Sequence, residues 1–295
     1  MSGTPVQVGC CEVQTKDPSE IVGPLDDIIQ AMAGLHGLDV SRYDETFLRK
    51  AIAKRLVVTG METLAAYCEH LPGSRAEAEA IFGSLRVNHS EFFRNPLSFA
   101  VLEQLVFPGL VEAKKKSGDI RIWSAGCAGG QEAWSVAMLL DEIIGANPPA
   151  YRVFATDLDG PDISFAQAGV YSAEALGNVR LQHMNKYLCR QGDSFAIAPL
   201  LRAHVDFSAY DLLDGSSSSP PASIYGGFDL ILCCNLLFYY RPEARKRILD
   251  KFSRALAPGG YFVTGEVERT TVSGHRGFRA LLPPAAVFRK TNVSP

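Results

Sequence analysis

The 295-residue sequence lacks a long uninterrupted apolar segment, a strong charge of either sign and an amino-terminal export signal. Its longest apolar run, at 228–240, contains Asp229 and Asn235 and falls short of the roughly 18 residues that a membrane span requires. Residues 1–20 are polar, without the basic start and apolar block of a secretory signal. The formal net charge is −3, which argues against a strongly basic nucleic-acid-binding surface. We therefore expect a cytoplasmic protein that neither binds nucleic acid nor inserts into a membrane.

Paired cysteine and histidine motifs are also missing. The seven cysteines are an odd set without a Cys-x-x-Cys spacing, and the six histidines show no i, i+4 pair that would place two ligands on one helix face. We therefore expect reduced thiols and no metal site built from neighbouring residues.

Apolar residues make up 47% of the chain, and their spacing changes along it. After a polar stretch at 1–20, which predicts a flexible tail, apolar residues recur every three or four positions from Leu25 to Leu85 and predict a small helical region. Its clearest helix is expected at 44–57. The apolar face of this helix comprises Phe47, Leu48, Ala51, Ile52 and Leu56, and the opposite face carries Arg49, Lys50, Lys54 and Arg55. Ordinary solvation explains such a basic face, and docking of an acidic helical partner is the alternative.

Beyond about Leu97, short apolar runs alternate with helical stretches, which predicts an α/β fold with a mostly parallel sheet. The expected strands are 120–125, 151–156, 205–210, 228–234, 261–264 and 286–289, and the expected crossover helices are 132–144, 163–168 and 242–256. The alternation lapses at 172–204, where an extended pair around Phe195–Ile197 follows Gly192-Asp193 and predicts an inserted subdomain. The run Ser216–Ser219 before Pro220-Pro221 predicts a surface loop.

The residues that follow each strand are candidates for ligand binding, because ligands of open α/β sheets lie beyond the carboxyl ends of the strands. The first turn, Gly126-Cys127-Ala128-Gly129-Gly130-Gln131-Glu132, fits neither the dinucleotide fingerprint nor the P-loop. A carboxylate at Glu132 would repel a phosphate and attract a cationic group, such as the ammonium and sulfonium of S-adenosylmethionine. Capping of its own helix is the alternative for Glu132.

Polar residues also follow the other expected strands. Asp157 is placed to accept hydrogen bonds from ribose hydroxyls, although alone it could cap a helix. Asp211 is placed to accept an adenine amino group. The fourth strand leads into Asn235 and Tyr239, whose polar groups need partners. Upstream, the segment 88–96 places polar groups beside an aromatic pair. By itself this pattern indicates a helix cap followed by aromatic residues that anchor the segment in the core.

Together these segments resemble the chemotaxis receptor methyltransferase family (CheR), which esterifies glutamate side chains on receptor helices with a methyl group from S-adenosylmethionine. The motifs are Asn88-x-Ser90-x-Phe92-Phe93-Arg94, Arg121-Ile122-Trp123-Ser124-Ala125-Gly126-Cys127, Glu132 with Ser135, Thr156-Asp157-Leu158-Asp159, and Cys233-x-Asn235 with Tyr239. The resemblance extends from about Leu25 to the carboxyl end. It implies a class I, Rossmann-like methyltransferase domain at 88–295 with a small inserted β subdomain at about 172–204. It also implies an all-α receptor-docking domain at 21–87.

The resemblance further implies the residues of the site. The cofactor, S-adenosyl-L-methionine, and its product, S-adenosyl-L-homocysteine, would be bound by Asn88, Ser90, Arg94, Glu132, Asp157, Asp211, Leu212, Cys234 and Asn235. Arg94 and Tyr239 would stand near the methyl transfer, and no metal is expected. The partners implied are glutamate-rich cytoplasmic helices of methyl-accepting chemoreceptors, bound by a monomer.

Several positions depart from the family pattern. Ala133-Trp134 stands where Pro-Tyr is common, Cys234 where Arg is common, and Gly265-Glu266-Val267-Glu268 where Gly-His-Ser-Glu is typical. The inserted segment near 190–201 is short. Two alternatives therefore stay open, a methyltransferase with another acceptor and a sensor that binds S-adenosylmethionine without turnover.

Overall fold

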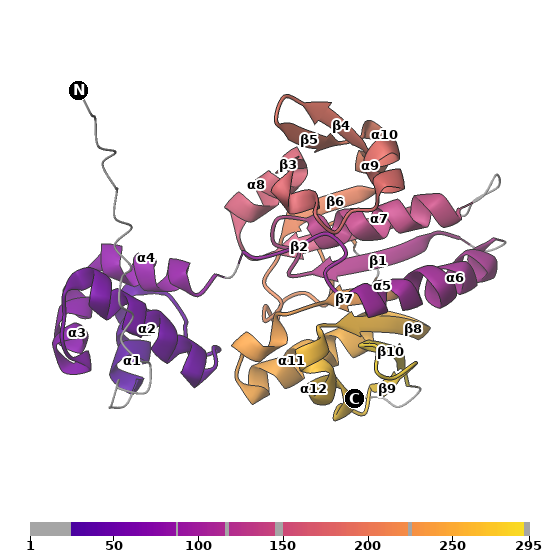
Figure 1. Ribbon diagram of the computed structural model, residues 1–295. Helices are drawn as coiled ribbons and strands as arrows, with labels where there is room; N and C mark the ends of the chain where they lie inside the picture. Colours follow the sequence, from indigo (N-terminus) through magenta and orange to yellow (C-terminus); the bar gives the residue numbers. More distant parts are fainter. Residues whose placement is uncertain (1–24, 87, 116–117, 145–149, 224–225, 292–295) are drawn as a thin grey trace, which may run out of the picture. The chain divides into compact units, whose positions relative to one another are not determined.

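The computed structural model describes residues 25–86, 88–115, 118–144, 150–223 and 226–291. The chain forms two compact units, Met1–Arg86 and Val87–Pro295 (Figure 1). The predicted tail at 1–20 lies outside the described residues.

The smaller unit is helical in its described part, with short side chains that cap its helices. Asp44, Thr63 and Ser74 each accept a hydrogen bond from a backbone N–H in the first turn of a helix. The helices are α1 (Asp26–His36), α2 (Glu45–Thr59), α3 (Leu64–His70), the 3₁₀ turn η2 (Leu71–Gly73) and α4 (Arg75–Ser84). Leu48, Ala51, Ile52 and Leu56 of α2 are buried, as the apolar spacing predicts, and Phe47 is half-buried.

The basic face of α2 is divided between exposed and engaged side chains. Lys50 and Lys54 are exposed. Arg55 forms a two-point ion pair with the buried Glu77, with Nε–Oε1 and Nη2–Oε2 distances of 2.8 and 2.7 Å, and Tyr67 donates a further hydrogen bond to the same carboxylate. The assignment of Arg55 to an open docking face is therefore wrong, because its charge is used inside the unit.

The larger unit is built on a seven-stranded sheet with the order β6-β2-β1-β7-β8-β10-β9. Strands β6, β2, β1, β7 and β8 run parallel, whereas β10 is antiparallel to both of its neighbours. Every residue of β7 is buried, as expected of a central strand covered on both faces. The strands are β1 (Ile120–Ala125), β2 (Tyr151–Asp157), β6 (Val205–Ala209), β7 (Phe228–Cys233), β8 (Leu256–Thr264), β9 (Phe278–Ala280) and β10 (Val287–Lys290). The predicted mostly parallel α/β sheet is confirmed.

The helices and turns of this unit connect successive strands. They are α7 (Gln131–Ile143), α8 (Gly160–Ala168), η4 (Glu174–Leu176), α9 (Leu181–Tyr187), α10 (Pro199–Arg202), η5 (Leu237–Tyr239), α11 (Pro242–Ala255), η6 (Glu266–Glu268) and α12 (Arg269–Ser273). A small antiparallel sheet is inserted between α8 and β6, in the order β3-β5-β4. Its strands are β3 (Val170–Ser172), β4 (Leu188–Gln191) and β5 (Ser194–Ile197). The predicted inserted β subdomain is confirmed.

A continuous helical segment, Pro96–Lys114, comprises α5 (Pro96–Val101), the π-helical η3 (Leu102–Val106) and α6 (Phe107–Lys114). Within the described residues it is the one helix long and apolar enough to cross a membrane, at 19 residues, although Glu103 and Glu112 interrupt its apolar sequence. Leu102, Val106 and Phe107 are fully buried in the core of the larger unit. Such burial is typical of a core helix, and length with composition alone is weak support for a span.

Candidate active site

The turn between β1 and α7 is held against the end of β2. The backbone N–H groups of Gly126 and Cys127 donate to the carbonyl oxygen of Thr156, at 2.8 and 2.9 Å. Gly126 has a φ of +74°, and a Cβ atom there would lie 2.7 Å from Cδ2 of Leu236. Glycine suits position 126 because its φ lies in the left-handed region, and a Cβ atom would also displace the end of the Leu236 side chain.

Asp157 lies at the end of β2 and is fixed by backbone groups. Its Oδ2 atom accepts from the N–H of Ala128 at 2.9 Å, and its Oδ1 atom accepts from the N–H of Asp159 at 3.1 Å. The carboxylate is half-buried, and each oxygen retains acceptor capacity. It fits a ligand that offers a pair of hydroxyl donors, such as a ribose.

Glu132 occupies the first turn of α7, where it is enclosed by protein atoms while part of its side chain stays accessible. Ser124 Oγ donates to its Oε1 atom at 2.7 Å, and the Cys234 thiol forms a second hydrogen bond. Burial raises the pKa of Glu132 and outweighs these hydrogen bonds, which lower it. Burial and the nearby Glu132 carboxyl also raise the pKa of the Cys234 thiol. Since no basic side chain of the described residues forms an ion pair with Glu132, the site fits a cationic ligand group.

The segment after β7 is held by Glu268, a residue that sequence reasoning did not assign to the site. Its buried carboxylate accepts hydrogen bonds from the N–H groups of Asn235 (2.9 Å), Leu237 (2.6 Å) and Gly265 (2.9 Å), and from Thr264 Oγ1 (2.8 Å). The only signal in the sequence was its place shortly after an expected strand, inside a segment that departs from the family pattern.

Asn235 adopts a left-handed backbone conformation, with a φ of 58°. Within the described part of the chain, its Oδ1 atom is buried and has no hydrogen-bond partner. A buried acceptor without a donor is costly, so this position fits a donor group supplied by a ligand. The amino groups of S-adenosylmethionine are donors of that kind.

The end of β6 is joined to the end of β2. The N–H of Tyr210 donates to the carbonyl oxygen of Asp157 at 2.8 Å. Asp211 is half-buried and accepts from the N–H of Leu213 at 2.9 Å, and Leu212 is buried. The structure thus brings the candidates Asp157, Asp211 and Leu212 to one edge of the sheet.

The segment at the start of the larger unit contacts α7 through Phe93. This residue has a φ of 51°, and its N–H donates to Ser135 Oγ at 3.1 Å. The neighbouring Arg94 donates to the carbonyl oxygen of His89 at 3.2 Å. Burial raises the pKa of Tyr239, and the charge of Arg94 lowers it, so these two side chains lie within electrostatic range.

Two of the predicted residues are not joined to the others. Asn88 is exposed and Ser90 is half-buried, and the hydrogen bonds of the described residues do not connect either to the rest of the site. No group of His, Cys, Asp and Glu side chains in the described ranges is arranged to hold a metal ion.

Comparisons with known proteins show which family the chain resembles. The family model described as "CheR methyltransferase, SAM binding domain" matches residues 88–281. The chain is 30% identical over 233 residues to the "Chemotaxis protein methyltransferase" of Listeria monocytogenes, covering 79% of this chain and 85% of that protein. It is 27% identical over 273 residues to the "Chemotaxis protein methyltransferase" of Borreliella burgdorferi, covering 90% and 93%.

A further relative is much longer than this chain. An uncharacterised 104.1 kDa protein of Rhodobacter capsulatus is 30% identical over 281 residues, which is 92% of this chain and 28% of that protein. The chain thus spans between a quarter and a third of this relative's length. The matched domain and the extent of the similarity lead to one conclusion: the chain belongs to the CheR methyltransferase family and contains its S-adenosylmethionine-binding domain.

Proposed function

We propose that the chain is a protein-glutamate O-methyltransferase that transfers the methyl group of S-adenosylmethionine to glutamate side chains of chemoreceptors. The observation that carries the proposal is the enclosed Glu132 carboxyl without an ion-paired cation, at the same edge of the sheet as the Asp157 carboxylate. These groups suit a ligand that bears an ammonium and a ribose. The similarity to proteins named chemotaxis protein methyltransferase supports the class of acceptor.

The bound cofactor would supply an electrophilic methyl group on a sulfonium. An acceptor glutamate has an ordinary pKa of about 4.3, so it is ionised at neutral pH and needs no general base. The protein then has to hold the two partners close and aligned. Such positioning can lower the activation barrier by about 7–11 kcal/mol. In this proposal Arg94 orients the acceptor carboxylate or the cofactor, and Tyr239 donates a hydrogen bond near the reacting atoms.

The remaining candidates would hold the cofactor. Glu132 would bind the ammonium, Asp157 the ribose hydroxyls, and Asp211 with Leu212 the adenine. Asn235 would use its unpaired Oδ1 atom to accept from an amino group. The other residues that we assign to this site are Asn88, Ser90, Arg94 and Cys234.

The helical domain at 21–87 would dock glutamate-rich receptor helices. Because Arg55 is paired with Glu77, the charges available for this role on α2 are Lys50 and Lys54, with Arg49 beside them. Arg49 also contacts Glu45 one turn earlier, at 2.7 Å. Attraction between these cations and an acidic helix would steer the encounter.

A methyl-transfer assay tests the proposed activity. The chain is incubated with tritiated S-adenosylmethionine and receptor cytoplasmic fragments, and alkali is then used to release volatile methanol from any ester. We expect volatile label with the native receptor and none with its Glu→Ala variants. Label that alkali does not release would show a different acceptor chemistry and contradict the proposal.

Two departures from the family pattern favour a different acceptor. Cys234, which stands where the family commonly has Arg, is bonded to Glu132, and Glu266 is exposed where the family typically has His. A chain with a diverged acceptor would give an alkali-stable methylated product. A sensor without turnover would bind the cofactor in a calorimeter and give no labelled product with any receptor fragment.

A further inference from the structure

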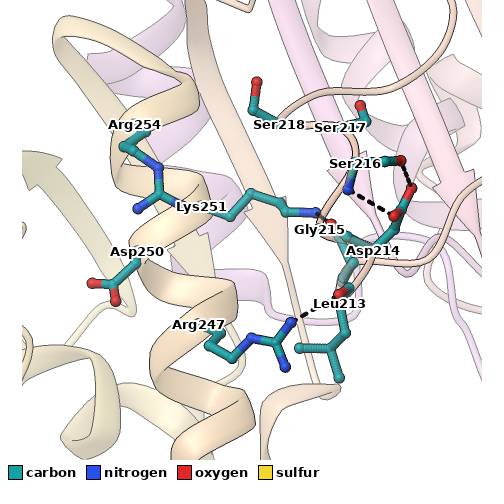
Figure 2. A pocket seen from close by; sticks show the side chains of 11 residues that line it. Leu213, Asp214, Gly215, Ser216, Ser217, Ser218, Arg247, Asp250, Lys251 and Arg254 are labelled. Atoms are coloured by element: carbon teal, nitrogen blue, oxygen red, sulfur yellow. Dashed lines mark hydrogen bonds between the residues drawn. The ribbon is translucent and has the colours of Figure 1, made fainter.

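One face of α11 carries three basic residues that line a pocket, and this pocket shares Leu212 with the proposed cofactor site. Arg247, Lys251 and Arg254 are spaced four and three residues apart, which places them on the same side of the helix. The facing wall is the loop 212–218, with the side chains of Ser216, Ser217 and Ser218 (Figure 2). The pocket has a volume of about 460 Å³.

Lys251 is the central cation of this pocket and is 94% buried, since its relative exposure is 6%. Its Nζ atom donates to the Tyr210 hydroxyl at 2.9 Å and to the carbonyl oxygen of Asp214 at 2.8 Å, and both partners are neutral acceptors. An ammonium has three donors, so one is left over. Buried charges are usually paired with an opposite charge, and Lys251 forms no ion pair with a carboxylate of the described residues.

The two arginines also lack anionic partners in the part of the chain that the structure describes. Arg247 donates from Nη2 to the carbonyl oxygen of Leu213 at 3.1 Å, and it is otherwise exposed. Arg254 is exposed and makes no hydrogen bond or ion pair with a described residue. Most of the guanidinium donors that line the pocket are therefore available to a ligand.

The acidic residues of the lining do not neutralise this cluster by contact. Asp214 accepts hydrogen bonds from the N–H and the hydroxyl of Ser216, at 2.8 and 2.6 Å, and these bonds, with a smaller contribution from the charge of Lys251, lower its pKa. Asp250 points away from the serine loop and binds Lys246 and His275, at 2.6 and 2.9 Å (Figure 2). An excess of positive charge therefore faces the loop.

We propose that this pocket binds a phosphorylated small molecule through its phosphate groups. Guanidinium groups present paired donors that match phosphate oxygens, and an ammonium adds a point charge. On the facing wall the Ser218 hydroxyl supplies a further donor, whereas the hydroxyls of Ser216 and Ser217 already donate to Asp214 and to the Ser219 carbonyl oxygen. The volume falls within the range of about 300–1,000 Å³ that is usual for small-molecule sites and exceeds what a single phosphate fills. No aromatic side chain lines the pocket, so recognition rests on the phosphates.

The pocket is linked by hydrogen bonds to Asp211, and this link rests on the proposed role of Asp211 in cofactor binding. The Leu213 N–H donates to Asp211 Oδ1, and the Asp214 N–H donates to the Asp211 carbonyl oxygen. A phosphate would draw Arg247 and Lys251 toward itself, and these are the cations that hold the carbonyl oxygens of Leu213 and Asp214. Occupancy therefore releases the loop beside Asp211 and weakens cofactor binding, and the coupling is reciprocal.

Calorimetric titration with sodium pyrophosphate tests the site in the full chain, at constant ionic strength. The variant Arg247→Ala/Arg254→Ala leaves the buried Lys251 intact, and the matched control Arg190→Ala/Arg279→Ala removes the same charge from exposed arginines outside the pocket. We expect saturable binding by the native chain and by the control. The pocket variant should bind at least about tenfold more weakly, because charge-assisted hydrogen bonds are lost.

Three results would contradict the proposal that this pocket binds phosphates. These are no saturation at millimolar pyrophosphate, equal weakening in both double variants, and displacement by sulfate as readily as by phosphate compounds, which would indicate an adventitious ion only. Thermal melting of each variant verifies that it is folded.

The coupling is tested separately, by titrating S-adenosylhomocysteine with and without saturating pyrophosphate. We expect pyrophosphate to weaken cofactor binding by about fivefold or more in the native chain and not in the pocket variant. Unchanged affinity while pyrophosphate is bound overturns the coupling. Both readouts are binding constants, so their failure is distinguishable from failure of the proposed methyl transfer.

Discussion

At the scale of single residues, Glu132 is the titrating group that the proposed cofactor should affect most. Burial raises its pKa in the free protein, and a bound ammonium would lower it again. At pH values below the raised pKa, cofactor binding should therefore release a proton from Glu132. The affinity for the cofactor should increase with pH until Glu132 is ionised. Calorimetry in buffers of different ionisation enthalpy measures the released proton. Glu132→Gln should abolish the dependence, and an unchanged profile in this variant would contradict the role of Glu132.

The same shift has a consequence for stability. A carboxyl whose pKa is raised on folding holds its proton more tightly in the folded state than in the unfolded state. The contribution of Glu132 to the free energy of unfolding is therefore present at low pH and is lost as pH rises from the unfolded pKa through the raised folded pKa. Urea denaturation over this pH range measures the free energy of unfolding. It should fall more steeply with rising pH in the cofactor-free native chain than in Glu132→Gln.

Glu268 provides a contrast, because its function is to satisfy buried donors. Replacement by Ala leaves three backbone N–H groups without their acceptor, whereas the Thr264 hydroxyl can still donate to the Cys233 carbonyl oxygen. Each unsatisfied buried group costs about 1–3 kcal/mol, so we expect a loss of several kcal/mol in the free energy of unfolding. Glu268→Gln keeps one acceptor oxygen and should lose less. The exposed neighbour is the control, and Glu266→Ala should change stability by less than about 0.5 kcal/mol.

Arg94 should affect turnover far more than stability. Its one described hydrogen bond goes to a backbone carbonyl, and its side chain is only half-buried. If it orients the acceptor, Arg94→Ala should lower kcat by about 100-fold, which is the typical cost of a small misplacement. Steady-state kinetics and a melting curve check both parts. Native turnover in this variant would rule out the assignment.

The sequence could indicate the site residues that directly follow strands, and it could not indicate those fixed by distant partners. Asp157 and Glu132 were identified because ligand-binding residues lie at the carboxyl ends of parallel strands. Glu268 was missed because two of its donors lie 31 and 33 residues earlier in the chain. The left-handed conformation of Asn235 likewise has no local glycine signal.

At the scale of elements, buried strands were predicted most accurately. The residues of β1 were predicted without error, and the ends of β2 and β7 differ by one residue, because continuous apolar runs identify strands buried on both faces. The start of β8 was placed too late, since Pro258, Gly259 and Gly260 give the pattern of a turn. The three-residue β9 was missed because it pairs with β10 alone and is too short to show alternation.

The basic face of α2 leads to a prediction about substrate encounter. Reversing Lys50 and Lys54 to Glu should lower kcat/KM for receptor fragments by about tenfold at low salt and reduce the salt dependence, because electrostatic steering is lost. Cofactor affinity should not change. The control Arg190→Glu/Arg279→Glu reverses the same charge on the larger unit. Equal kinetic effects of the two double variants would show that overall charge, and not this face, is responsible.

At the scale of the whole molecule, every residue that we assign to cofactor binding belongs to the larger unit. Hydrogen exchange should therefore show protection by S-adenosylhomocysteine at 126–131, 157–159, 211–213 and 235–239, with α1 to α4 as an internal reference. At 100 times the dissociation constant, the ligand stabilises the form that binds it by about 2.7 kcal/mol. Protection spread evenly over both units would contradict the assignment of these segments.

The hydrogen bonds of Glu268 have a consequence for redesign of the enzyme. Three of its four partners are main-chain amides, so they fix the shape of the segment after β7 without constraining which side chains that segment carries. Phe238 and Val267, on the two turns joined by Glu268, are 37% and 73% exposed. A combinatorial library at these two positions would therefore vary the surface offered to a methyl acceptor while the backbone beside the cofactor keeps its shape.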